Sequence, residues 1–174
     1  TLKIATITVT GAGALAENFS WTAASEDYEV IADATNRIYR GQIPADEAAA
    51  QLTLADGTTT YFYTSLSNAV VGANNNPGST LKLLQDASTS GRIALSKSYT
   101  VDLNGKTWDV NGYLEVRATG DVYFINSNKD QGGTLDGTDT AVFVLNIRGG
   151  SVTIGEDVTV IGNTILLANA DNGK

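Results

Sequence analysis

The side chains that could carry chemistry in this 174-residue chain are mostly carboxylates and amides, because it contains no histidine and no cysteine. Histidine is the commonest general base and metal ligand, and cysteine supplies disulfides and thiolates. A Ser-His nucleophile and a zinc-thiolate site are therefore excluded. Glycosidases need two carboxylates about 5–10 Å apart, and the nearest matches are Asp136 with Asp139 and Glu156 with Asp157. We interpret the first pair as a solvated turn, and the second would point to opposite sides of a strand.

Three aspartates in glycine-rich turns are candidate ligands for Ca²⁺, namely Asp130, Asp136 and Asp139. Calcium takes six to eight oxygen ligands from carboxylates, carbonyls and amides. The simpler interpretation, which we favour, is that these are charged turns facing water. The sequence requires no cofactor.

Three aromatic residues could form a platform for a sugar or another ligand, namely Trp108, Tyr113 and Tyr123. They fall on neighbouring repeats of a strand-rich region, so their rings could line one surface. Buried aromatic side chains that stack in a core give the same spacing. We favour the core interpretation and keep the platform as the alternative.

Asparagine follows an apolar residue at the end of four short strands, at Asn104, Asn126, Asn146 and Asn169. The spacings are 22, 20 and 23 residues, and a period of 20–25 residues is typical of one turn of a parallel β-solenoid. Stacked turns would place the amides about 4.8 Å apart, where they could bond along the stack as a ladder. Chance recurrence of asparagine at turns is the alternative.

The elements that would position these residues divide the chain in two. Residues 1–50 contain several short strand patterns and form an N-terminal strand-rich region of unknown role. Its first strand, residues 3–10, is a candidate assembly strand that could complete the sheet of a neighbouring molecule. The residues that would do so are Ile4, Thr6, Ile7, Thr8, Val9 and Thr10.

Residues 51–174 begin with a hairpin around Asp56-Gly57, a strong two-residue turn. A short helix follows, with Leu66, Ala69, Val70 and Ala73 on one face, and Pro77-Gly78 ends it. The rest is a run of short strands separated by Gly, Asn and Asp. At its centre, residues 98–110 (SYTVDLNGKTWDV) predict a strand, a tight corner at Asn104-Gly105 and a second strand.

Three segments resemble the N-terminal part of a right-handed parallel β-helix of the pectate-lyase-like type found in large bacterial surface and adhesin-like proteins. They are residues 63–70 (YTSLSNAV), 80–86 (TLKLLQD) and 102–107 (DLNGKT). The resemblance covers roughly residues 51–174 and implies a helix that caps the open end of stacked coils. Its hydrolases carry a Gly-His-Gly motif and its lyases an Arg-Pro-type motif. This chain has no histidine, and its only prolines are Pro44 and Pro77.

The net charge of −8 argues against nucleic acid and anionic membranes as partners, because both attract basic surfaces. No apolar run is long enough to insert into a membrane. Threonine, asparagine and 18 glycines in a weakly charged chain are typical of an extracellular β-protein. A chain that begins at Thr1 is expected to be a processed or excised piece of a longer protein.

The sequence therefore predicts an all-β protein, a right-handed parallel β-helix with a short capping helix. The expected function is that of a non-enzymatic extracellular or cell-surface module, adhesin-like or a stalk segment, that binds carbohydrate or protein. The alternative is a subunit that binds copies of itself and forms a filament. It would use strand addition by residues 3–10 or end-to-end stacking of coils. A polysaccharide-active enzyme is the third and least favoured interpretation.

Overall fold

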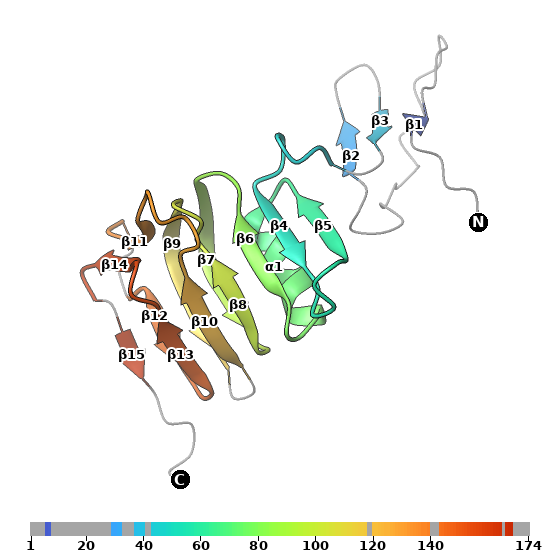
Figure 1. Ribbon diagram of the computed structural model, residues 1–174. Helices are drawn as coiled ribbons and strands as arrows, with labels where there is room; N and C mark the ends of the chain where they lie inside the picture. The colour runs from blue at the N-terminus through green and yellow to red at the C-terminus, as the bar shows by residue number, and fades with distance from the viewer. Residues whose placement is uncertain are drawn as a thin grey trace.

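The computed structural model describes residues 43–117, 120–139 and 143–164, together with the short strands Thr6–Ile7, Glu29–Ala32, Arg37–Arg40 and Leu166–Ala168. Apart from one helix, the regular structure in these residues is β-strand. The strands form three sheets, and Figure 1 shows their order along the chain.

The N-terminal strands form a small antiparallel sheet of their own in the order β1-β3-β2. The three strands are β1 (Thr6–Ile7), β2 (Glu29–Ala32) and β3 (Arg37–Arg40). The predicted assembly strand is therefore paired within its own chain, because Thr6 lies opposite Arg40 and Ile7 opposite Tyr39. Ile4, Thr8, Val9 and Thr10 lie outside the described residues.

The hairpin predicted around Asp56-Gly57 is confirmed as β4 (Ala50–Thr53) and β5 (Thr60–Tyr63). Gly57 takes a φ of 73°, which glycine adopts without steric cost. One Asp56 oxygen accepts hydrogen bonds from the Thr58 and Thr59 amides, and the other accepts the Thr59 hydroxyl. These bonds, that of the Thr59 hydroxyl foremost, lower the pKa of Asp56 to about 2. Protonating this carboxyl would loosen the turn.

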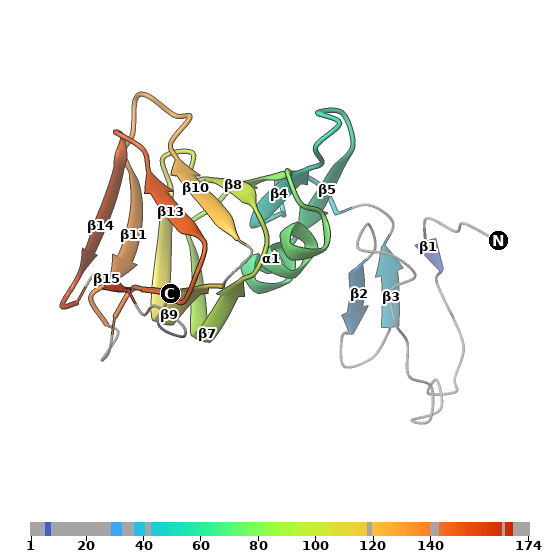
Figure 2. The ribbon, with the colours of Figure 1, turned by 90° about the horizontal axis from the view of Figure 1, so that it is seen from below.

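The helix α1 (Leu66–Asn75) has one buried face, which includes Leu66, Ala69, Val70 and Ala73 as predicted. It contacts the hairpin strands and the first two strands of the coiled region, β6 (Thr80–Leu83) and β7 (Ala87–Leu95). Figure 2 shows it at one end of the stacked strands. The helix therefore covers the open end of the core, and Asn76-Pro77-Gly78 leads the chain away from it.

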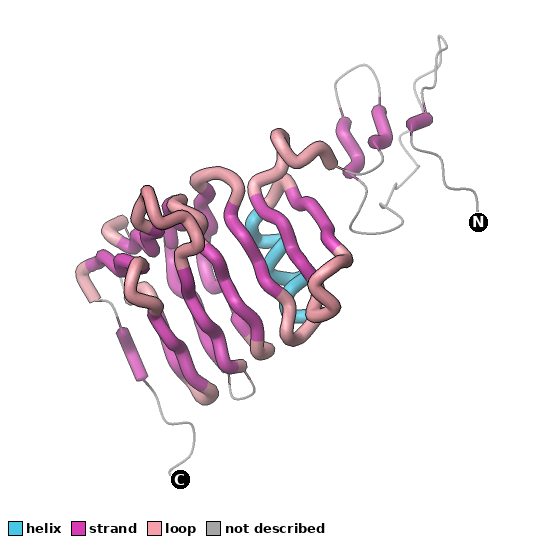
Figure 3. The backbone as a smooth tube through the Cα atoms, in the orientation of Figure 1, coloured by secondary structure: helices cyan, strands magenta, loops and turns pink. Residues whose placement is uncertain are grey.

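The remaining strands make about three turns of a parallel β-solenoid, which confirms the predicted architecture. One wall is a sheet in which neighbouring coils pair in parallel, while β4 pairs antiparallel with β6 at the helix end. Its coil strands are β6, β8 (Tyr99–Asp102), β10 (Asp121–Ile125) and β13 (Ser151–Ile154). Figure 3 shows these strands stacked side by side with loops at both ends.

The other wall bends where two glycine residues of neighbouring strands lie opposite each other. β7 pairs along its whole length with β9 (Thr107–Val116), and Gly91 lies opposite Gly112 in this pairing. A Cβ atom on Gly112, whose φ is 155°, would lie 2.1 Å from the Gly91 carbonyl oxygen. In the later coils the strand is split at this level. The pieces are β11 (Gly133–Gly137), β12 (Leu145–Ile147), β14 (Val158–Gly162) and β15 (Leu166–Ala168).

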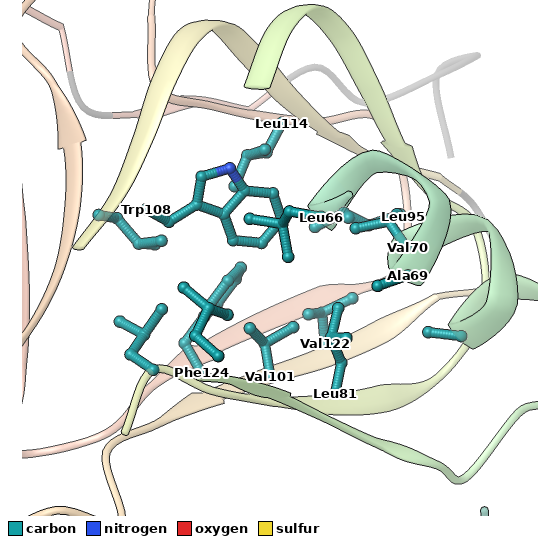
Figure 4. Close-up of a cluster of buried hydrophobic side chains, with 14 of the residues drawn as sticks. Leu66, Ala69, Val70, Leu81, Leu95, Val101, Trp108, Leu114, Val122 and Phe124 are labelled. Carbon is teal, nitrogen blue, oxygen red and sulfur yellow. The ribbon is translucent and has the colours of Figure 1, made fainter. Parts of the chain in front are cut away.

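The core lies between the two walls because alternate strand residues point inward. In β10, Val122 and Phe124 are buried, whereas Tyr123 and Ile125 are exposed. The Trp108 and Phe124 rings meet in this core with centroids 6.5 Å apart. Figure 4 shows Leu66, Ala69 and Val70 of α1 reaching the same cluster.

Candidate binding surface

The predicted calcium ligands do not form a site in the part of the chain that the structure describes, where no three acidic side chains group as metal ligands would. Asp136 instead closes its own turn, since the amide and hydroxyl of Thr138 both donate to its Oδ1, at 2.9 and 2.8 Å. Asp130 donates its amide to Asn128 Oδ1, and Asp139 is exposed. These contacts fit the interpretation of the three aspartates as charged turns.

Both residues of the second acidic pair, Glu156 and Asp157, are exposed, and Asp157 forms an ion pair with a lysine. The Lys129 ammonium group donates to Asp157 Oδ2 across the loops of two neighbouring coils. The hydrogen bond to Asp157 and its negative charge raise the pKa of Lys129. Glu156 lies next to this ion pair, so the arrangement favours a surface contact between coils over a pair of cooperating carboxylates.

Two of the predicted ladder asparagines, Asn104 and Asn126, fix the loops that connect the two walls by hydrogen bonding to backbone groups. Asn104, with a φ of 51°, donates its Nδ2 to the Leu83 carbonyl of the preceding coil at 2.9 Å. Asn126 is buried and accepts the Gly105 amide on Oδ1 at 2.5 Å. Its Nδ2 donates to the carbonyls of Asn128 and Gln131 at 2.7 and 2.6 Å. In both cases the partner of the amide is backbone.

The registers correct the idea of one ladder of stacked asparagine amides. Ile125 pairs with Asp102, so the next residue, Asn126, lies at the level of Leu103. It is therefore one residue out of register with Asn104. Asn146 lies in the other wall, in register with Glu115. Asn169 lies outside the described residues. A spacing near 22 residues predicts the length of one coil. It does not predict which wall each asparagine occupies, because loop lengths differ between coils.

The predicted aromatic platform is not formed, because the three rings face different environments. Trp108 is fully buried, and its Nε1 donates to the buried Thr89 Oγ1 at 2.8 Å, as the core interpretation predicted. For Tyr123 the core interpretation is wrong, because this side chain is 47% exposed; it lies on β10, in the opposite wall from Tyr113 of β9. Of the three, only Tyr113 belongs to the surface described next.

A buried carboxylate surrounded by arginines is the polar feature that the sequence analysis missed. Glu115 is 3% exposed and lies in β9 between the core residues Leu114 and Val116. Its Oε1 accepts Arg117 Nε at 2.8 Å. A guanidinium nitrogen of Arg92 lies 3.9 Å from the same oxygen, and one of Arg148 lies 3.9 Å from Oε2. The available signal was the recurrence of an apolar residue followed by arginine at two strand ends, Val116-Arg117 and Ile147-Arg148.

An aromatic pair adjoins this cluster. Arg92 lies opposite Tyr113 in the pairing of β7 with β9, and the Tyr113 and Phe143 rings have centroids 5.0 Å apart at 60° to each other. Asn146, opposite Glu115, is 6% exposed, and its Oδ1 has no hydrogen-bond partner among the described residues. We call this region the arginine–aromatic surface, defined by Arg92, Tyr113, Glu115, Arg117, Phe143, Asn146 and Arg148.

The other buried carboxylate among the described residues, Asp102, accepts hydrogen bonds from two backbone amides. Its Oδ1 accepts the amides of Asn104 and Ser127, each at 2.9 Å, and so ties the loops of two coils together. Its Oδ2 lies 3.7 Å from Lys82 Nζ in the preceding strand. This carboxylate therefore has structural partners on both oxygens.

Comparisons with protein-family models, with curated proteins and with solved structures gave no match to this chain. Among the residues that the structure describes, no helix is long and apolar enough to cross a membrane. The site is therefore interpreted from its own geometry.

Proposed function

We propose that this chain is a non-enzymatic, extracellular or cell-surface binding module in which a parallel β-solenoid presents a contact surface on its outer wall. The observation that carries the proposal is the arginine–aromatic surface, whose three guanidinium groups come from β7 and from the residues that directly follow β9 and β12. Coils held together by long in-register ladders form a rigid support, and rigid elements position contact residues well.

The partners of the acidic side chains support a binding role over catalysis. Asp102 and Glu115 are each held by hydrogen bonds and ion pairs within the solenoid, and Asp136 is held by its own turn. A catalytic pair needs one carboxylate poised to give up a proton and another to attack or activate water. These carboxylates serve instead to fix loops and arginine side chains.

An adhesin-like or stalk role in a larger surface protein is the setting that this proposal fits best. A composition rich in threonine, asparagine and glycine without cysteine supports it, as does the resemblance of residues 51–174 to β-helices of such proteins. The filament alternative stays a second proposal, since β1 lies at the edge of its sheet and pairs with β3 on one side.

Two measurements test the proposal. Antibodies raised against the purified chain should label intact source cells, and labelling only after lysis would contradict a surface location. Incubation with a panel of polysaccharides should release no new reducing ends. Release that stops in an Asp136→Asn or Glu156→Gln variant of unchanged thermal stability would instead establish an enzyme.

A further inference from the structure

We propose that the arginine–aromatic surface binds an acidic segment of a partner protein through the side-chain carboxylates of that segment. This inference rests on the proposed function as a binding module and adds the chemical class of its partner. It follows from the local charge, from the spacing of the arginines and from the arrangement of the aromatic pair.

The local charge is positive although the chain carries a net charge of −8. Three guanidinium groups surround one carboxylate, and only Arg117 lies within hydrogen-bond distance of it. The side chains of Arg92, Arg117 and Arg148 are 52%, 45% and 46% exposed, whereas that of Glu115 is 3% exposed. The buried Glu115 carboxylate therefore attracts the three guanidinium groups to one place, and about half of each arginine side chain stays exposed. The planar guanidinium group matches a carboxylate in geometry and charge.

The spacing of the arginines suits an extended peptide. Arg92 lies in β7 and Arg148 follows β12, and both strands pair with β9. Neighbouring strands lie about 4.8 Å apart, so the two outer strands are about 10 Å apart. In an extended chain, side chains on one side repeat about every 7 Å. Two acidic residues of a peptide crossing the strands would therefore come within reach of different arginines.

The neighbouring groups favour a protein partner over a sugar. Arginine, tyrosine and other aromatic residues are the types enriched where protein interfaces gain most of their binding energy. The Tyr113 and Phe143 rings are inclined at 60°, so the pair offers no common flat platform for a sugar ring.

The test is a calorimetric titration with a synthetic peptide of alternating glutamate and serine. A matched peptide carries glutamine in place of glutamate, and a carboxylated oligosaccharide is titrated in parallel. The informative variant combines Arg92→Gln with Arg148→Gln, which leaves the 2.8 Å bond between Arg117 and Glu115 in place. The control combines Lys106→Gln with Lys129→Gln, because it lowers the net charge equally at the loops between the walls.

The glutamate peptide should bind the unmodified chain, and the arginine variant should weaken binding about tenfold or more. The lysine control should stay within about twofold, and higher salt should weaken binding. No binding of the glutamate peptide at millimolar concentration, or equal loss in both double variants, would overturn the proposal. Preference for the oligosaccharide would overturn the protein partner yet leave the module a binding protein. If the arginine double variant fails to fold, Arg92→Gln alone should still weaken binding about threefold.

Discussion

Buried polar side chains in this solenoid differ sharply in how well they are satisfied. Asn126 makes three hydrogen bonds to backbone groups, whereas the Tyr99 hydroxyl is buried without a partner in the described structure. An unmade buried hydrogen bond costs free energy, and a complete set holds a loop in one conformation. Removing these two groups should therefore affect stability in opposite directions.

Replacing Asn126 with alanine should lower the free energy of unfolding by about 1–3 kcal/mol, because the Gly105 amide and two carbonyls lose their partner. Asn111→Ala is the matched control, since Asn111 is exposed and its Nδ2 bonds only the Asp109 side chain. It should change stability by less than about 0.5 kcal/mol. Urea unfolding of both variants measures this, and equal losses would contradict the role given to Asn126.

Replacing Tyr99 with phenylalanine should raise stability at pH 7 by about 1 kcal/mol, because it removes the unpaired buried hydroxyl. Burial raises the pKa of Tyr99 above its ordinary value of 10.0, since the buried phenolate is disfavoured. Below pH 10 the chain keeps its full stability, because the Tyr99 hydroxyl is protonated in both the folded and the unfolded chain. Stability is lost as pH rises further, because the unfolded chain then ionises first.

The unmodified chain should therefore lose stability above about pH 10 more steeply than the Tyr99→Phe variant. The difference should approach about 1.4 kcal/mol per pH unit, the value for one ionising group. Thermal unfolding of both proteins between pH 8 and pH 11 measures it. Parallel pH profiles would show that the Tyr99 hydroxyl is not buried in the way described.

At the scale of elements, the strands were predictable because alternation of apolar and polar residues sets the face of each side chain. The hairpin at Asp56-Gly57 and the buried face of α1 follow from other local signals, a two-residue turn and a helical period. The bend of the second wall does not, because it depends on Gly91 meeting Gly112 across two coils. No local pattern shows which glycines will be neighbours 21 residues apart.

Replacing Gly112 with alanine should lower stability by about 3 kcal/mol or more, because the new Cβ would overlap the Gly91 carbonyl oxygen. Gly132→Ala is the control, since nothing lies within 4 Å of a Cβ built there. The control should change stability by less than about 1 kcal/mol. Circular dichroism during thermal unfolding compares them. A stable Gly112→Ala protein would mean that β7 and β9 do not approach as described.

For the whole molecule, the coil period predicts the solenoid architecture but does not predict the arginine–aromatic surface. The hairpin, the capping helix and the stacked strands each left a local trace in the sequence. The arginine–aromatic surface combines Arg92, Glu115 and Arg148 from three coils of unequal length, and only the actual register brings them together. The same dependence on register explains why Asn104, Asn126 and Asn146 do not stack as one ladder, and why the rings of Trp108, Tyr113 and Tyr123 face different environments.

We propose that the interior of the solenoid provides stability and that the arginine–aromatic surface provides binding, and one paired measurement tests this division most directly. Affinity for the glutamate peptide and urea stability are determined together for Asn126→Ala and for the Arg92→Gln, Arg148→Gln double variant. We predict that the first loses stability but, while folded, keeps its affinity. The second should lose about tenfold or more in affinity yet remain folded, because Arg117 still bonds the buried Glu115. A folded arginine variant with unchanged affinity would contradict the account.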